Sequence, residues 1–575
     1  MMINNLILYC KAHLFRSLLA AYVLALSPWS LAIAEITPDT GAILQQLQPI
    51  APAQPSSNDT GLKLGIPSSA KLPMSEAFQL NVLILNGNHA ISSAVLQALV
   101  SNAIGTKITL SELDALATRI TDYYHSHGYP LARAYVPAQS IASGIVRIEV
   151  LEAHYGTINL ENHSLVKDSL VQSTLAPIKS GQPITQSSTD SALLLLSDIP
   201  GVSSMATLKP GSEVGSSDLD IKTEATPLIS GNLSTDNYGN RYNGRARGGA
   251  TVNVNNALHI GDVLSLSGMS AGENMNYGRI SYEALLNGQG TRLGASYFYL
   301  DYALGDSLQS LNAYGTAQIA SAWVKQPLLR GRDLNFYGQL QYDHSQLNDS
   351  IGISDIQTYR HVDNGTATIS GDSRDNLFKG ATNTWNASWT GGQVDFDNSA
   401  AQLADTSTKH SQGLFSKVNI NLSRLQNITE KANIYASFSG QWAQDNLDSS
   451  KKMVVGGPYT VRAYDMGALS ADTGYLGTVE LRHLLAEGRL GLWQAVGFVD
   501  SAQVTINQTT WIAGTNKATL SGAGGGINWL APKTNWLIPT QLHARAYVAT
   551  PIGSVSSLVG STSSTRAWLE FGLGF

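Results

Sequence analysis

The sequence predicts a transmembrane β-barrel of about 16 antiparallel strands, preceded by two α/β modules, a linker and an N-terminal helix. Three observations carry this prediction. Apolar and polar residues alternate with a period of two over roughly 350 residues, as they do in strands with one apolar face. The chain also opens on an export signal, and its final residues form a strand of the same alternating kind.

Composition limits the class of protein. Charged residues make up 14% of the chain and hydrophobic residues 43%, with 53 glycines, 23 tyrosines and 10 tryptophans. In a soluble domain about a quarter of all residues are charged. A membrane barrel needs one apolar face per strand and no long apolar run. Beyond the export signal, no uncharged apolar run approaches the roughly 20 residues of a membrane-spanning helix. The net charge of −6 argues against nucleic acid as a partner.

Residues 1–34 are expected to form a secretory signal peptide. A basic lead and an apolar core precede Ala32 and Ala34, which have the spacing of a cleavage site. The mature chain would then begin at Glu35. An uncleaved membrane anchor is the alternative, and a proline in the segment together with its small-residue ending disfavours it. The only cysteine, Cys10, lies inside this segment, so the mature chain would have no disulfide or thiolate chemistry.

Residues 35–49 are expected to form a short helix. Pro38 and Asp39 suit its first turn, and Pro49 would end it. Three apolar residues would share one of its faces: Ile43, Leu44 and Leu47. The residues that follow, 50–77, have the proline- and serine-rich composition of a linker. Periodicity alone leaves two interpretations open, a docking helix and an unstructured tail with nascent helix.

Residues 78–153 and 154–226 are expected to form two compact α/β modules. In each module a strand is followed by two helices and two more strands, so the order β-α-α-β-β recurs after about 75 residues. The second helix of the first module would place four residues on one apolar face: Leu113, Leu116, Ile120 and Tyr124. The Gly-Tyr-Pro sequence at 128–130 would end that helix.

Residues 227–575 carry the alternating pattern of the predicted barrel. In the segments 334–342 and 434–442, for example, apolar residues or glycine occupy every second position. A soluble β-sandwich would show the same alternation. The export signal and the long helix-free stretch favour the outer membrane instead. A barrel of this size is wide enough for an aqueous channel unless something fills it.

The last strand is expected to close the barrel. Its apolar side chains form the barrel's C-terminal signal: Phe571, Leu573 and Phe575. A glutamate and two glycines alternate with them. An open edge in lipid would leave backbone N–H and C=O groups without hydrogen bonds, at a cost of several kcal/mol each. We therefore expect this strand to pair with the first strand of the barrel.

Motifs in several segments resemble one known family. They are PDTGAILQQL (38–47), GYPLARAYVPAQ (128–139), LSDIPGV (196–202) with ATLKPG (206–211), and GGPYTVRAY (456–464). They are similar to the pore helix, the first and second POTRA domains and the infolded loop of the two-partner secretion transporters. These transporters are the outer-membrane haemolysin activation/secretion proteins of the Omp85 superfamily. The resemblance covers essentially the whole mature chain and makes 35–49 a pore-plugging helix.

The resemblance also implies a conformational latch. The family's loop tip usually reads Val-Arg-Gly-Tyr or Val-Arg-Gly-Phe, and a Phe-x-Asp motif lies on the barrel wall. The corresponding residues here are Val461, Arg462, Ala463 and Tyr464 at the tip, and Phe498 and Asp500 on the wall. Arg462 would pair with Asp500 and hold the loop in one position. If position 463 requires a positive φ, its alanine would cost about 1 kcal/mol or more.

The function that the resemblance implies is protein secretion. The POTRA domains, in the periplasm of a bacterium, would capture an unfolded exported partner, and the barrel would pass it to the cell surface. The expected partner is a large TpsA-type exoprotein of the haemolysin, adhesin or contact-dependent toxin type. Outer-membrane lipids, periplasmic chaperones and the barrel assembly machinery are the other expected partners.

Three alternative functions stay open at this point. An Omp85-type assembly factor would usually carry more than two POTRA domains, and a passive porin needs none. An enzyme is the third, because residues 268–272 match the G-x-S-x-G pattern. That motif requires a strand-to-helix turn, whereas these residues lead into another strand. No catalytic residue, cofactor or metal site is expected.

Overall fold

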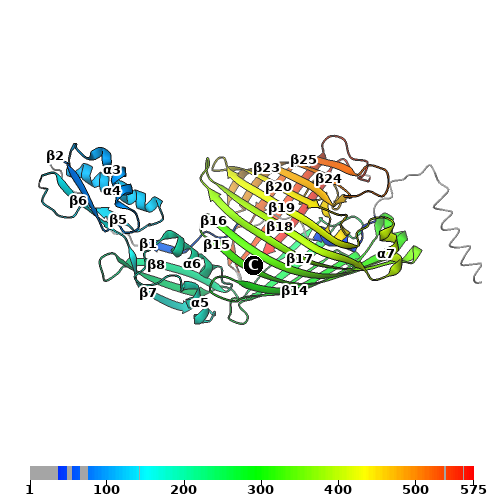
Figure 1. Ribbon diagram of the computed structural model, residues 1–575. Coiled ribbons are helices and arrows are strands. Elements are labelled where there is room, and N and C mark those ends of the chain that lie inside the picture. The colour runs from blue at the N-terminus through cyan, green and yellow to red at the C-terminus, as the bar shows by residue number, and fades with distance from the viewer. Residues whose placement is uncertain (1–36, 48–54, 65–75, 142, 536–538, 561–562) are drawn as a thin grey trace, which may run out of the picture.

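The structure, a computed structural model, shows a barrel with an arm of two small modules at one end (Figure 1). It describes residues 37–47, 55–64, 76–141, 143–535, 539–560 and 563–575. The predicted signal peptide, 1–34, lies outside the described residues, as do both ends of segment 35–49. None of the helices in the described part of the chain is long and apolar enough to cross a membrane.

The first module packs helices against a small sheet. Its strands are β2 (Phe78–Gln79), β3 (Val82–Asn86), β4 (Lys107–Ile108), β5 (Arg133–Tyr135) and β6 (Ile145–Leu151), and its helices are α3 (Ser93–Val100), η1 (Ser101–Ala103) and α4 (Leu110–Ser126). Strand β6 lies between β3 and β5. Helix α4 begins at a capping box, in which Thr109 and Glu112 each accept a hydrogen bond from the other's backbone N–H. The predicted apolar face of α4 is buried: Leu113, Leu116, Ile120 and Tyr124.

The second module repeats this plan. It contains β7 (His154–His163), α5 (Asp168–Leu175), α6 (Gln186–Ser197), β8 (Val202–Pro210) and β9 (Ser216–Ala225). One short strand lies within the predicted linker, 50–77. Residues Leu62–Leu64 form a strand, β1, that pairs in parallel with β8 and gives the sheet order β1-β8-β9-β7. The linker composition did not reveal this strand because its three residues are too few to show a period.

The barrel wall is a closed ring of 16 antiparallel strands in the described residues. The strands are β10 (Ile229–Asp236), β11 (Arg247–Asn255), β12 (Val263–Ser270), β13 (Met275–Leu285), β14 (Arg292–Ala303), β15 (Ala313–Arg330), β16 (Leu334–Ile351), β17 (Ile356–Asp375), β18 (Ala381–Phe396), β19 (Gly413–Asn427), β20 (Ala432–Ala443), β23 (Thr473–Gly488), β24 (Gly491–Thr505), β25 (Lys517–Leu530), β27 (Pro539–Pro551) and β28 (Arg566–Gly574). A two-residue strand, β26 (Thr534–Asn535), pairs with β27. The predicted strand number and antiparallel arrangement are confirmed.

The last strand closes the ring against the first. In the register of β28 with β10, Phe571 lies opposite Thr235 and Leu573 opposite Leu233. Phe575 continues the pairing, because its backbone exchanges hydrogen bonds of 2.8 and 2.9 Å with Gly231. The backbone N–H and C=O groups at this edge, which lipid could not hydrogen-bond, are therefore paired up to the final residue.

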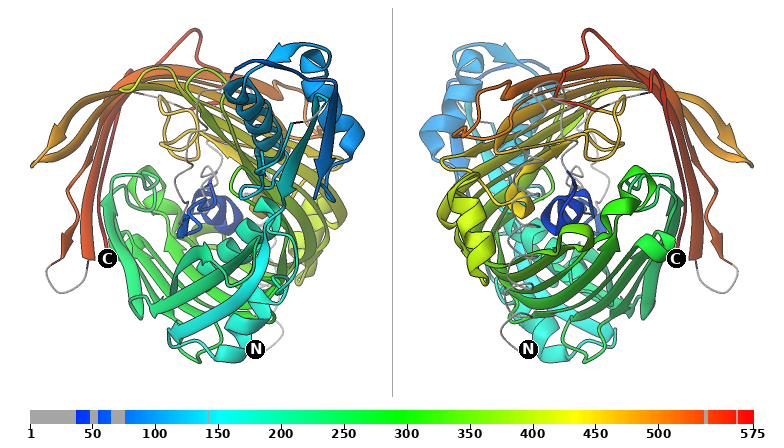
Figure 2. Two further views of the ribbon diagram at one scale, coloured as in Figure 1. Left: turned by 90° about the vertical axis from the view of Figure 1, so that its left-hand side faces the viewer. Right: turned by 90° about the vertical axis from the view of Figure 1, so that its right-hand side faces the viewer.

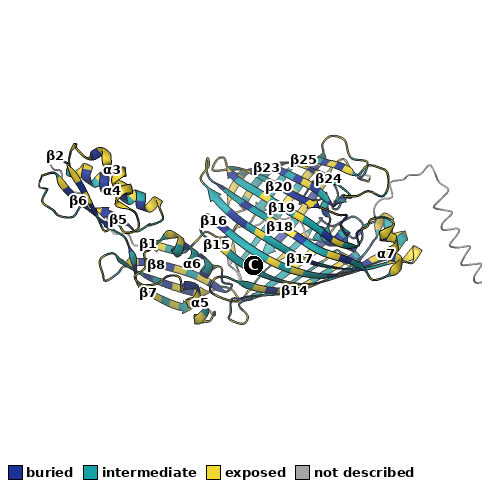
Figure 3. Cartoon of the chain, viewed as in Figure 1, coloured by how far each residue is buried: buried dark blue, intermediate teal, exposed yellow. Residues whose placement is uncertain are grey.

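Exposure changes from residue to residue along the strands of the wall, as the colours of Figure 3 show. On β23 and β24 the apolar residues Val479 and Val499 are 56% and 51% exposed on the outside. Their chain neighbours Glu480 and Asp500 are 7% and 0% exposed, which places them on the lumen side. The wall therefore has an apolar outer belt and a polar interior, the arrangement of a membrane barrel.

Two segments lie inside the barrel (Figure 2). One is helix α2 (Thr40–Leu47), and the other is the loop 444–472 that joins β20 to β23. The loop contains η5 (Ser449–Lys451), β21 (Met453–Val455) and β22 (Leu469–Ala471). Four further short helices lie in connections between wall strands: η2 (Gly272–Asn274), η3 (Asp306–Leu311), η4 (Gly352–Ser354) and α7 (Ser399–Thr406).

Candidate functional site: the barrel lumen

The tip of the infolded loop is a tight turn. Gly456 and Gly457 have φ angles of 97° and 114°, a conformation that L side chains rarely adopt. The N–H of Gly457 donates to the carbonyl of Tyr464 at 3.1 Å and draws the two ends of the turn together. Val461 and Tyr464 are fully buried in an apolar cluster with residues of β23, β24 and β25. The turn therefore holds Arg462, which directly follows Val461, at a fixed place on the wall.

Arg462 forms hydrogen-bonded ion pairs with carboxylates of the barrel wall. Its Nε and Nη2 donate to the two carboxylate oxygens of Asp500 at 2.8 and 2.7 Å, and its backbone N–H donates to the same group at 3.1 Å. Its Nη1 donates to Glu480 Oε1 at 2.6 Å. The guanidinium carbon also lies 3.4 Å from the ring centre of Phe498. The structure thus brings together all the charged and aromatic groups that the motifs had singled out.

Two partners of the tip were missed in the sequence. Glu480 binds both Arg462 and Arg482, and the indole N–H of Trp568 donates to the carbonyl of Arg462 at 2.7 Å. Glu480 had a signal, because it is a charged residue at an inward position on the strand that pairs with the Asp500 strand. Trp568 had none, since β28 lies far away in the sequence and only barrel closure brings it to the loop.

The alanine at the loop tip packs against a glycine of the wall. Ala463 is not among the described residues with positive φ, so the strain considered for this position does not arise. Its methyl group instead lies over Gly522 of β25. A Cβ added to Gly522 would be 2.3 Å from the Cβ of Ala463, a distance that real Cβ atoms do not adopt. The wall glycine therefore provides the space that the tip alanine fills.

A paired substitution tests this contact. We expect Gly522→Ala to push the tip off the wall and to lower secretion at least tenfold. Both methyl groups are attached directly to rigid backbone, so neither can rotate out of the way. Adding Ala463→Gly removes the clash and should restore secretion, since the closest remaining contact of the new methyl group is 3.2 Å to the Thr550 carbonyl. Secretion is measured as partner protein in the medium. Equal secretion by Gly522→Ala and the unchanged chain would contradict the docking.

Helix α2 is held in the lumen by apolar packing against the wall and by a close contact with the infolded loop. Ile43 and Leu44 are 1% and 3% exposed, and Leu47 packs at the edge of the same cluster. The cluster includes wall residues such as Leu300 and Leu347. Gly41 touches the loop backbone so closely that a Cβ there would be 2.4 Å from the N of residue 450. The helix therefore contacts both the wall and the infolded loop.

A second buried arginine, Arg360 of β17, fixes the beginning of that helix. It donates to Asp448 of the loop at 2.6 Å, to Asp349 of β16 at 2.7 Å and to Asp39, the residue before the helix, at 3.4 Å. The backbone N–H of Thr40 donates to Asp349 at 2.8 Å. Burial alone would raise the pKa of the Asp448 carboxyl, but the nearby Arg360 charge holds that pKa below its usual range. Wall, loop and helix therefore meet at one guanidinium group.

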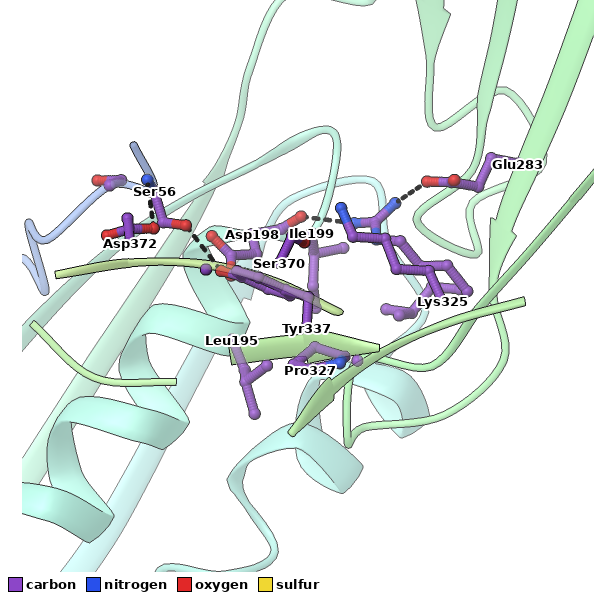
Figure 4. Close-up of a pocket in the computed structure, with 15 residues that line it drawn as sticks. Ser56, Leu195, Asp198, Ile199, Glu283, Lys325, Pro327, Tyr337, Ser370 and Asp372 are labelled. Atoms are coloured by element: carbon purple, nitrogen blue, oxygen red, sulfur yellow. Dashed lines mark hydrogen bonds and ion pairs between the residues drawn. The ribbon is translucent and has the colours of Figure 1, made fainter. Parts of the chain in front are cut away.

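A cavity of about 450 Å³ lies where the second module meets the barrel mouth (Figure 4). Its lining includes Ser56, Asp198, Tyr337 and Asp372. Beside it, Arg330 at the end of β15 donates to both carboxylate oxygens of Asp198 at 2.6 and 2.9 Å. This ion pair ties the end of α6 to the barrel. Among the described residues, no group of three or more His, Cys, Asp or Glu side chains is placed to hold a metal ion.

The fold and these contacts match known proteins. Residues 215–529 match the family of haemolysin secretion/activation proteins ShlB/FhaC/HecB, and residues 78–153 match the ShlB-type POTRA domain. The heme/hemopexin transporter protein HuxB of Haemophilus influenzae is 31% identical over 78% of this chain and 80% of its own. The outer membrane transporter CdiB of Escherichia coli is 22% identical over 79% and 80%.

The solved structure of CdiB from Escherichia coli has the same fold. It superimposes with a TM-score of 0.70 at 17% identity, over 94% of this chain and all of the other. The family match spans more than half of the chain, and these findings favour secretion over a barrel assembly factor or a passive porin. The chain belongs to the haemolysin secretion/activation family ShlB/FhaC/HecB, the two-partner secretion transporters, and works in the bacterial outer membrane with its POTRA domains in the periplasm.

Proposed function

We propose that this transporter passes one large, unfolded exoprotein to the cell surface and stays closed until that partner arrives. The observation that supports this is the double plug in the lumen. The loop tip 456–464 and helix α2 are each held to the wall by a buried arginine with two or more carboxylates. Such contacts are strong and directional but not covalent, so binding elsewhere can release them. The chain carries out no reaction of its own.

The strand edges of the two POTRA domains indicate what kind of partner the chain binds. Both POTRA sheets have strand edges, and an unfolded polypeptide can add to such an edge through its backbone. Haemolysins, adhesins and contact-dependent toxins are the candidate cargo classes. The greater identity to HuxB than to CdiB makes a heme- or hemopexin-binding exoprotein the first cargo to test. Lipids around the apolar belt, periplasmic chaperones and the barrel assembly machinery complete the proposed partners.

Deletion of the arm tests the proposal. We expect removal of residues 78–226 to abolish secretion of the partner exoprotein, because the arm carries the strand edges proposed to capture it. The barrel should still insert, which a heat-dependent shift in gel mobility would show. A passive channel needs no arm. Partner secretion that survives the deletion would therefore contradict the transporter mechanism, and the full-length chain expressed in parallel is the control.

A further inference from the structure

The infolded loop and helix α2 enclose a second cavity against the barrel wall, and Figure 2 shows both segments in the lumen. The cavity has a volume of about 230 Å³, which is enough for several water molecules. The described residues that line it include two lysines, Lys417 and Lys452, and no aspartate or glutamate. This composition distinguishes it from the cavity at the barrel mouth, whose lining includes Asp198, Glu283 and Asp372.

Strands β19 and β20 present a row of neutral polar side chains to this cavity. In the register of the two strands, Asn421 stands opposite Ser439 and Asn419 opposite Gln441. All four residues line the cavity. Their amide and hydroxyl groups can donate hydrogen bonds as well as accept them. The wall side of the cavity can therefore offer several donors to one bound group.

Lys417 adds a positive charge that no carboxylate of the described residues balances. Its ammonium group donates to Gln441 Oε1 at 3.2 Å and to the carbonyl of Lys451 at 2.8 Å, and both acceptors are neutral. The charged group that acts on it is the ammonium of Lys451, which is also positive. Lys452 differs, because it forms an ion pair with Asp472 at 2.9 Å. A charge held away from bulk water without a counter-ion is costly, and an anion in the cavity would supply that counter-ion.

The plug contributes two further buried polar side chains to the same cavity. Thr460 at the loop tip is 7% exposed, and its hydroxyl has no hydrogen-bond partner among the described residues. Gln46 of α2 is equally buried and lines the cavity as well. Buried polar groups in folded proteins nearly always have a partner. The unpaired hydroxyl of Thr460 therefore points to a bound group that the chain itself does not provide.

We propose that this cavity binds a small oxyanion of the phosphate type, and that the bound anion helps to hold the plug in the lumen. The lining offers ammonium, amide and hydroxyl donors without a carboxylate among the described residues, so it attracts an anion and repels a cation. The donors belong to three segments: Lys417 to the wall, Gln46 to the helix and Thr460 to the loop. One anion would therefore join all three. This inference goes beyond secretion and does not depend on the identity of the partner.

Phosphate binding to the purified full chain in detergent tests the site. We expect isothermal titration calorimetry at constant ionic strength to show saturable binding of inorganic phosphate. Lys417→Met, which removes the charge, should weaken it at least tenfold, and Thr460→Val, which removes the hydroxyl, should weaken it several-fold. Lys325→Met is the matched control, since Lys325 lies in the cavity at the barrel mouth. Heat-dependent gel mobility checks that each variant is folded. No saturable binding at millimolar phosphate, or equal binding by Lys417→Met, would overturn the site.

Conductance in planar lipid bilayers tests whether the anion holds the plug. With potassium chloride as the constant electrolyte, we expect added millimolar phosphate to lower the mean conductance at least twofold, compared with the same ionic strength of added chloride. The chain lacking residues 37–47 has no helix to hold, so phosphate should not change its conductance. An equal effect of phosphate on Lys417→Met would overturn this role, because phosphate would then act elsewhere. If the unchanged chain binds phosphate but its conductance does not respond, the anion does not hold the plug. Neither measurement involves secretion.

Discussion

Replacing Arg462 with alanine is expected to lower secretion at least tenfold and to free the loop tip from the wall. The substitution leaves Asp500 buried without the one cation that pairs with it among the described residues, and it removes one of the two arginines on Glu480. Removing one partner of a buried ion pair typically costs about 3–5 kcal/mol, because the other charge stays desolvated. The strands of the wall do not depend on this residue, so the barrel should still form.

Secretion of the partner and heat-dependent gel mobility are the two measurements. Asp500→Ala should have a similar effect, whereas Arg462→Lys should retain part of the function, since an ammonium group keeps the charge but loses the two-pronged contact. Arg482→Ala is the matched control, because Arg482 also binds Glu480 but does not touch the tip. Full secretion by both alanine variants at the pair would refute the latch.

The sequence predicts the barrel well because its signal is repeated in every strand. A period of two needs only local residues, and closure by the final strand follows from the cost of an open edge in lipid. The signal that predicts the Arg462–Asp500 pair is of another kind. An arginine and an aspartate 38 positions apart carry no sign of contact by themselves, so the pairing depended on the motifs around them.

The contacts that the sequence did not predict are those between distant elements. Nothing local marks Arg360 as the residue that joins helix α2 to the loop, because its three carboxylates come from three separate segments. The question raised by Ala463 had its answer 59 residues away, at Gly522. Local patterns place such residues on a face, but only the closed ring determines which faces meet.

Replacing Arg360 with alanine is expected to open the pore. The change leaves three carboxylates without their shared cation: the buried Asp448 and the partly buried Asp39 and Asp349. Like charges at such distances repel, and the group that is easiest to move is Asp39, since it directly precedes a helix of only eight residues. The helix should therefore leave the lumen for a larger share of the time.

Conductance in planar lipid bilayers measures this opening, and the chain lacking residues 37–47 sets the open limit. We expect Arg360→Ala to raise the mean conductance several-fold toward that limit, and Asp39→Asn to raise it less, because Arg360 keeps two carboxylates. Arg424→Ala, which breaks a more exposed pair with Asp375 on the wall, should leave conductance unchanged. In the chain without the helix, Arg360→Ala should add little, since two changes that act through one contact are not additive. If Arg360→Ala raises conductance equally with and without the helix, the arginine supports the wall and does not hold the plug.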